Sequence, residues 1–323
     1  MYKNNNFELN NRGAFNMCAK LRKVVITGCT GTIGVALVNR LTEFGIQCVL
    51  LNPARFVNKD AYVDKSKLEF IDCALDQYES FAKSKELPDG CDAFIHLAWQ
   101  GTIGPGRDDV KLQLENLKGA VDAVELAKAM GCKCFVGAGS QAEYGKGVED
   151  YPREYRPVTG YGMAKLSASH LCKLKAHQLG LRFNWVRIFS VFGPHSSSLS
   201  LTQYVVESLL NGISPELTKC EQVWDFLYTK DAVDAIWAIA ERGKDGKTYE
   251  LGSGQTGTIR SFLENVPEWL GIDVALSFGA KEYPPNQIMK MCADIKELQE
   301  DTGWKPAYTF KDGILAIAAS LRQ

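Results

Sequence analysis

The residues best suited to chemistry in this sequence are a tyrosine and a lysine four positions apart, Tyr161 and Lys165. Residues at i and i+4 share a helix face, so the ammonium can lie near the phenol or near a group that bridges them. A nearby positive charge favours phenolate and lowers a tyrosine pKa from its ordinary value of about 10. Ser140, which ends the segment Val136-Gly137-Ala138-Gly139-Ser140, can hydrogen-bond a substrate oxygen beside Tyr161. We therefore predict proton transfer to or from a carbonyl or alcohol by these three residues.

A glycine-rich segment, Gly28-Cys29-Thr30-Gly31-Thr32-Ile33-Gly34, follows a continuous apolar run and precedes a stretch with helical periodicity. Its first glycine permits a tight turn, its second lets the backbone approach a pyrophosphate, and its third allows close helix packing. The helix N-terminus then offers unpaired N–H groups to phosphates. This context predicts a dinucleotide-binding loop. We expect its cofactor contacts at Gly28, Thr30, Gly31, Thr32, Ile33 and Gly34.

The choice of nicotinamide cofactor depends on residues after the second predicted strand. Asn52 stands where NAD enzymes usually carry an acidic residue for the ribose 2′-hydroxyl, and Arg55 follows closely. A carboxylate would repel a 2′-phosphate, whereas an arginine can pair with it. We therefore predict NADP(H), with NAD(H) as the alternative. Asp72, after the third predicted strand, is a candidate partner for the adenine amine.

The elements that position these residues alternate between strand and helix. Apolar runs predict strands at residues 23–27, 48–51, 68–71, 93–97, 132–136 and 183–188. Helical periodicity predicts helices at residues 32–44, 109–130 and 161–179, each closed by a glycine. Strands separated by helices of this length indicate an α/β fold of the Rossmann type with a doubly wound parallel sheet.

Three regions are predicted along the chain. Residues 1–20 are polar with six asparagines and are expected to be a disordered extension, with Met17 as a candidate natural start. Residues 21–192 form the dinucleotide-binding domain. Residues 193–323 are richer in Ser, Pro and Gly loops and form mainly a substrate-binding region, interleaved with late strands of the main sheet. Helices are expected there at residues 233–241 and 314–321.

Composition argues against several function classes. The 323 residues include 37 Lys and Arg against 38 Asp and Glu, so no basic field is available for a nucleic-acid partner. No apolar run approaches the roughly 20 residues that span a bilayer, so no membrane partner is expected. Ten scattered cysteines are expected to be small buried hydrophobes in a reducing cytoplasm, without a metal or disulfide role.

Together these motifs resemble the extended short-chain dehydrogenase/reductase family, which comprises nucleotide-sugar epimerases, dehydratases and reductases. The resemblance covers nearly the whole chain after Lys20 and rests on TGCTGTIG, HLAW, Asn116, SQAEYG, YGMAK, RIFSVFGP, YTKDAVDAI and TGWKP. It implies a homodimer built on helices 109–130 and 161–179. It also implies further cofactor contacts at Leu97, Ala98, Trp99, Asn116, Tyr161, Lys165 and Ile188.

The resemblance also narrows the reaction. Family 4,6-dehydratases carry Asp-Glu after the catalytic threonine, but Gln141 and Ala142 stand here, so dehydration is not expected. GSQAEYG and EQVWDFLYTKD resemble reductases of CDP- or dTDP-4-keto-6-deoxyhexoses, although Gln222–Phe226 replaces an arginine that often meets a phosphate. We predict NADP(H)-dependent reduction of such a nucleotide sugar. Expected substrate contacts are Trp99, Gln141, Tyr144, Phe189, Ser190, His195 and Trp224.

Two alternatives remain open. One is an NAD-dependent nucleotide-sugar 4-epimerase, which removes a hydride and returns it to the other face of the sugar. The other is a non-catalytic dinucleotide sensor, but such relatives usually lose the Tyr/Lys pair that this chain retains. His96, within an apolar run, is expected to be a core histidine.

Overall fold

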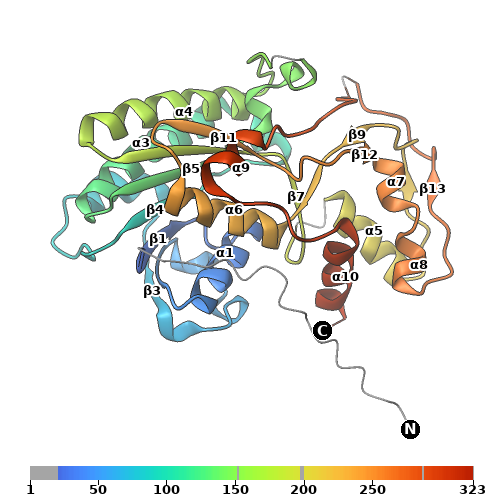
Figure 1. Ribbon diagram of the computed structural model, residues 1–323, viewed down its shortest axis with the longest axis horizontal. Helices are drawn as coiled ribbons and strands as arrows, with labels where there is room; N and C mark the ends of the chain where they lie inside the picture. The colour runs from blue at the N-terminus through green and yellow to red at the C-terminus, as the bar shows by residue number, and fades with distance from the viewer. Residues whose placement is uncertain (1–20, 151–152, 197–199, 286, 323) are drawn as a thin grey trace, which may run out of the picture.

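The centre of the molecule is a seven-stranded parallel sheet (Figure 1). The computed structural model describes residues 21–150, 153–196, 200–285 and 287–322, so the expectations for residues 1–20 lie outside the described part. The strand order is β11-β6-β5-β4-β1-β2-β3, and the order reverses between β1 and β4, where ligands bind in such sheets. The predicted doubly wound α/β fold is confirmed. The strands are β1 (Lys23–Thr27), β2 (Gln47–Leu51), β3 (Leu68–Ile71), β4 (Ala93–His96), β5 (Cys134–Ser140), β6 (Arg182–Ile188) and β11 (Lys247–Leu251).

Helices cover both faces of this sheet (Figure 1). On one face α1 (Thr32–Glu43) packs against α6 (Thr229–Arg242). On the other face α2 (Tyr78–Phe81), α3 (Val110–Ala129) and α4 (Gly160–Leu179) pack together. Alternate residues of each central strand enter the two apolar cores, which is why β1 reads as a continuous apolar run.

Capping residues determine where the two long helices begin. The Asp109 side chain accepts hydrogen bonds from the backbone N–H groups of Lys111 and Leu112, at 3.1 and 3.2 Å, and starts α3. The Thr159 hydroxyl accepts from Gly162 N at 3.1 Å and starts α4, which ends at Gly180 with a φ of 66°. These caps place Tyr161 in the first turn of α4, facing the carboxyl ends of the strands.

The fifth strand differs from its predicted range of residues 132–136. Its first two predicted residues lie in the turn after α3, where Cys132 N donates to Ala127 O at 3.0 Å. The strand instead continues to Ser140 through Gly137 and Gly139, which pair with β6 and lie against the Trp185 side chain. A Cβ at Gly137 would lie 2.3 Å from Trp185 Cζ3, and one at Gly139 would lie 2.2 Å from Trp185 Nε1. The tryptophan therefore requires glycine at these two strand positions.

A third apolar core lies beside the sheet, around Phe192, Tyr228 and Phe310. The two helices predicted for residues 193–323 begin four residues before their predicted starts, α6 at Thr229 and α10 at Phe310. The remaining helices are α5 (Leu201–Leu210), α7 (Ile259–Leu263), α8 (Val266–Leu270), α9 (Lys296–Thr302) and α10 (Phe310–Leu321). The short strands pair as β7 (Ser190–Phe192) with β10 (Phe226–Tyr228), β8 (Glu216–Leu217) with β13 (Ser277–Phe278), and β9 (Val223–Trp224) with β12 (Gly257–Thr258).

No helix in the described ranges is long and apolar enough to cross a membrane. Nor do those ranges bring together three His, Cys, Asp or Glu side chains in a group that could hold a metal ion.

Candidate active site

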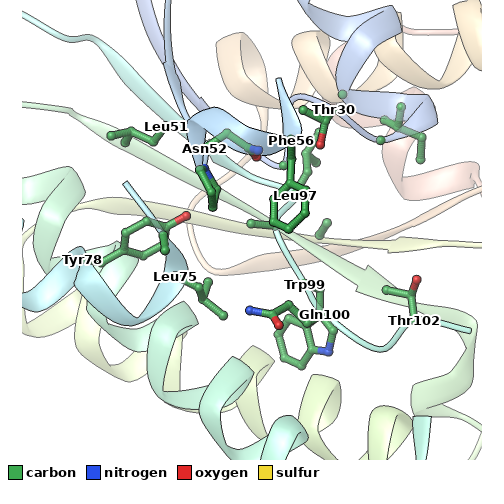
Figure 2. Close-up of a pocket in the computed structure, with 18 of the residues that line it drawn as sticks. Thr30, Leu51, Asn52, Phe56, Leu75, Tyr78, Leu97, Trp99, Gln100 and Thr102 are labelled. Carbon is green, nitrogen blue, oxygen red and sulfur yellow. The ribbon is translucent and has the colours of Figure 1, made fainter. Parts of the chain in front are cut away.

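A cavity of about 1140 Å³ lies over the carboxyl ends of β1 to β6 and reaches the first turns of α1 and α4. Figure 2 shows Asn52, Leu97 and Trp99 among the side chains around it. The cavity brings together every predicted cofactor residue except Asn116. These residues are Gly28, Thr30, Gly31, Thr32, Ile33, Gly34, Asn52, Arg55, Asp72, Leu97, Ala98, Trp99, Tyr161, Lys165 and Ile188. It also has lining residues that the sequence reading missed, Phe56, Leu75, Gln77, Gln100 and Thr102 among them.

Glycine occupies each of the three positions in the loop after β1 for a different structural reason. Gly28 has a φ of +69°, and a Cβ there would lie 2.6 Å from Ala98 N. A Cβ at Gly34 would lie 2.1 Å from the Gly28 carbonyl oxygen, so this glycine packs against the loop itself rather than against the sheet. Gly31 meets only that carbonyl, at 3.7 Å, and it is the N-cap of α1 without a side chain to cap the helix. The loop leaves the N-terminus of α1 available to a pyrophosphate.

The far end of the cavity lies beyond β2 and β3. Asp72 accepts a hydrogen bond from Ala54 N at 2.9 Å, so one oxygen of this carboxylate holds the loop after β2. Arg55 is exposed in the short helix Ala54–Phe56, and its guanidinium lies 4.8 Å from the Phe56 ring centroid. Asp76 lines the same cavity. Both a cation and carboxylates are therefore present where an adenosine ribose would bind.

Tyr161 lies at the other end of the cavity, which Ser140 and Lys165 also line. Burial raises the pKa of Tyr161, the Ser140 side chain and the Arg107 guanidinium lower it, and the Glu143 carboxylate raises it. The Arg107 guanidinium lies 4.5 Å from the Tyr161 ring centroid and donates to Thr102 O at 2.7 Å. Sequence reasoning missed Arg107, because it lies in a loop with no periodicity or motif around it.

The side chain of Lys165 is buried beside Tyr161. Its ammonium donates to the Ala138 carbonyl at 2.6 Å and lies 3.8 Å from the Trp99 ring centroid. Burial lowers the pKa of Lys165 to about 7, against the opposite effect of the Glu143 carboxylate. The sequence predicted that Lys165 lowers the pKa of Tyr161. In the structure the cation that lowers this pKa is Arg107.

Asn116 lies behind the cavity wall and holds the loop that follows β4. Its amide accepts from Gln100 N and donates to Gln100 O, each at 2.9 Å. One helical turn earlier, Gln113 accepts from Trp99 Nε1 at 2.8 Å. The predicted asparagine therefore orients Trp99 and Gln100 rather than lining the cavity itself.

The predicted substrate residues separate into two groups. Trp99 and Phe189 line the cavity, whereas Gln141, Tyr144, Ser190, His195 and Trp224 are not among its lining residues. Tyr144 is buried and donates to Glu250 Oε1 at 2.7 Å. Trp224 Nε1 donates to Ser190 Oγ at 2.7 Å, and His195 is exposed with its carbonyl accepting from Thr32 Oγ1 at 2.8 Å.

His96 and the cysteines take no part in this cavity. His96 is buried with its Nδ1 2.8 Å from Thr27 Oγ1, and burial lowers its pKa to about 3, with a contribution from the Lys165 ammonium. It is thus a neutral core histidine at physiological pH. The nine cysteines of the described ranges are free thiols, and all but Cys292 are buried.

Comparison with known proteins places this geometry in a family. Residues 24–252 match the NAD dependent epimerase/dehydratase family. The chain belongs to this family. It is similar to CDP-abequose synthase of Salmonella typhimurium, with 25% identity over 298 residues that cover 90% of this chain and 95% of the relative. It is also similar to dTDP-4-dehydro-6-deoxyglucose reductase of Escherichia coli, with 24% identity over 326 residues, 95% of this chain and 99% of the relative.

A solved structure of a 4-epimerase has the same fold as this chain. UDP-N-acetylglucosamine 4-epimerase from Methanobrevibacter ruminantium superposes with a TM-score of 0.83, covering 94% of this chain and 99% of that chain at 22% identity. The resemblance to extended short-chain dehydrogenases/reductases is therefore confirmed. The cavity fits the dinucleotide of this family, because Gly31 leaves room at a helix N-terminus and Lys165 and Tyr161 line the opposite end.

Proposed function

We propose that this chain reduces the 4-keto group of a nucleotide-activated 6-deoxyhexose, with NADPH as the hydride donor. The observation that carries the proposal is that Ser140, Tyr161 and Lys165 line the same cavity as the phosphate loop. The two relatives similar over nearly their whole length, CDP-abequose synthase and dTDP-4-dehydro-6-deoxyglucose reductase, support this substrate class. Gln141 and Ala142 argue against dehydration, because neither side chain can act as an acid or base.

Four side chains at this end of the cavity have different roles in the proposed reaction. Reduced nicotinamide, when bound, supplies the hydride for the sugar carbon. Ser140 holds the carbonyl oxygen beside the Tyr161 hydroxyl, and Tyr161 donates its proton to the alkoxide that forms there. Lys165 holds the nicotinamide ribose and, when protonated, favours the phenolate that remains. Arg107, whose guanidinium lies 4.5 Å from the ring centroid, stabilises the same phenolate.

The proposal is tested by mixing the protein with NADPH or NADH and a CDP- or dTDP-4-keto-6-deoxyglucose and following the loss of reduced-nicotinamide absorbance. We expect consumption of NADPH. Tyr161→Phe is expected to lower turnover by about 10²–10⁴-fold while cofactor binding is retained. Full activity of that variant would refute the role of Tyr161.

A nucleotide-sugar 4-epimerase with tightly held NAD is the second candidate. Asp72 and Asp76 favour it, because two carboxylates at the ribose end of the cavity oppose a 2′-phosphate. Interconversion of a nucleotide sugar without added cofactor, together with no net consumption of either reduced cofactor, would establish this function instead. A sensor without catalysis would show neither result.

We also propose that residues 193–323 mainly bind the sugar nucleotide.

We further propose that the chain forms a homodimer through α3 and α4. Five large apolar side chains on these two helices are exposed, namely Val110, Leu114, Met163, Leu171 and Leu174. Burying them against a second copy would remove this apolar surface from water. Light scattering should give the dimer mass for the native protein and the monomer mass for Leu171→Glu/Leu174→Glu. A native monomer at micromolar concentration would refute the dimer.

A further inference from the structure

A buried ion pair lies directly behind Ser140. Glu143 is 0% exposed and Arg187 is 5% exposed. The Arg187 Nε donates to Glu143 Oε2 at 2.6 Å. Burying two charges costs desolvation energy that their attraction often does not recover, so such a pair is weak evidence for a purely stabilising role. Its position in the proton-transfer centre suggests a functional one.

The second carboxylate oxygen of Glu143 holds the strand that carries Ser140. Glu143 Oε1 accepts from Ser140 N and from Trp185 Nε1, each at 2.9 Å. A Cβ at Gly139 would lie 2.4 Å from this oxygen, so only glycine allows the strand to approach the carboxylate so closely. Both oxygens of Glu143 are therefore engaged, one by Arg187 and one by the Ser140 backbone and the Trp185 indole.

The charge of Glu143 also reaches the two titratable groups of the centre. It raises the pKa of Lys165 and the pKa of Tyr161, in each case as one of several contributions. The other groups facing Lys165 are Cys172 and His96, and Arg107 faces Tyr161. Among these, Glu143 is the carboxylate that favours a protonated lysine.

Beyond Arg187 the network continues away from the cavity. Arg187 Nη1 donates to the Tyr144 hydroxyl at 3.1 Å, and that hydroxyl donates to Glu250 Oε1 at 2.7 Å. Arg153 Nε donates to the same oxygen at 2.8 Å. Glu250 thus belongs to the same network as Glu143, but it contacts neither Ser140 nor the groups around Lys165.

We propose that Glu143 is a positioning residue of the proton-transfer centre: its carboxylate, oriented by Arg187, holds the Ser140 backbone in place and supplies a negative charge beside Trp185, whose ring the Lys165 ammonium also approaches. The kinetic consequence rests on the proposed reductase function, whereas the charge on Lys165 can be measured without substrate. Glu143 acts on the substrate only through Ser140, Tyr161 and Lys165.

The test is Glu143→Gln in the full-length protein, which keeps the shape of the side chain and removes its charge. Tryptophan fluorescence reports the state of Lys165, because its ammonium lies 3.8 Å from the Trp99 ring centroid. The pH titration of this emission, corrected with Lys165→Met as the baseline, has an expected midpoint of about 7 in the native protein. In Glu143→Gln the midpoint should fall by about one pH unit, since an opposite charge has been removed. Turnover should fall roughly 10–100-fold, with the KM for NADPH little changed.

The matched control is Glu250→Gln, which makes the same substitution in the same network. It is expected to alter thermal stability and to leave the titration midpoint of Lys165 unchanged. A native midpoint in Glu143→Gln, or an equal shift in Glu250→Gln, would overturn the proposal. If Glu143→Gln does not fold, the double variant Glu143→Gln/Arg187→Gln removes both charges together, and its midpoint must also fall. Absence of hydride transfer by the native protein would refute the proposed function alone, because the titration needs no substrate.

Discussion

Replacing Lys165 by methionine removes the buried charge of the proton-transfer centre while keeping an unbranched side chain of similar reach. Lys165 is 3% exposed, and burial lowers its pKa from 10.5 to about 7. The folded protein thus disfavours the ammonium, even with a carbonyl oxygen at 2.6 Å. This cost must appear in the pH dependence of stability.

The direction and size of this pH dependence of stability follow from the different proton affinities of the folded and unfolded states. The unfolded chain keeps the Lys165 proton up to about pH 10.5, whereas the folded protein releases it near pH 7. Between these values the unfolded state binds more protons, so this group makes the free energy of unfolding rise with pH. At about 1.36 kcal/mol per pKa unit, the shift corresponds to at most roughly 4–5 kcal/mol. The destabilisation is complete below pH 7 and disappears as the pH rises to about 10.5.

The assay is urea unfolding of the native protein and of Lys165→Met between pH 6 and pH 10. The stability advantage of Lys165→Met should be greatest at pH 6 and should shrink steadily above pH 7, while its hydride-transfer activity is lost. Lys173→Met, on an exposed position of the same helix, should run parallel to the native curve. Parallel curves for Lys165→Met as well would show that the lysine is not destabilised by burial, and the reasoning would be refuted.

Three other substitutions test separate parts of the molecule. Arg55→Ala should raise the KM for NADPH roughly ten- to hundredfold, because a charge-assisted hydrogen bond contributes about 1.5–3 kcal/mol. The KM for NADH should not change. Equal effects on the two KM values would exclude a contact between Arg55 and the 2′-phosphate. Gly34→Ala places a Cβ 2.1 Å from Gly28 O, so thermal unfolding should show a loss of about 1–3 kcal/mol, and fluorescence titration should show weaker cofactor binding. Because the pKa of His96 is about 3, the free energy of unfolding should fall as the pH drops below 6.5, by at most about 1.4 kcal/mol per pH unit. His96→Asn should reduce this pH dependence, as measured by unfolding curves recorded at acid pH.

The cofactor half of the site could be predicted because its signals are local. The phosphate loop lies between a buried strand and a helix within a dozen residues, and the Tyr161–Lys165 spacing needs only one turn of helix. The fourth strand and the residues after it were found for the same reason. Each prediction required one periodicity and one glycine context, without any partner distant in the sequence.

The missed features depend on contacts between distant parts of the chain. Gly137 and Gly139 lie beyond the predicted strand 132–136, and their place in β5 depends on pairing with β6, the strand that carries Trp185. The Glu143–Arg187 pair joins residues 44 positions apart, and either residue alone reads as an ordinary surface charge. The two-residue strands β8 and β13 exist only because they pair across about sixty residues. No local pattern could have indicated these contacts.

The electrostatics of Tyr161 bear on the direction of the reaction. Because burial raises its pKa in spite of Ser140 and Arg107, the phenol is held protonated at neutral pH. A protonated phenol beside a carbonyl oxygen is prepared to donate, which is the step that ends a ketone reduction; an oxidation must instead begin by removing a proton from an alcohol, which requires phenolate. An epimerase performs that oxidation first, so its phenol must lose a proton before hydride transfer. The buried Glu143 carboxylate raises the same pKa, so it adds to the preference for the protonated phenol from which a reduction draws its proton.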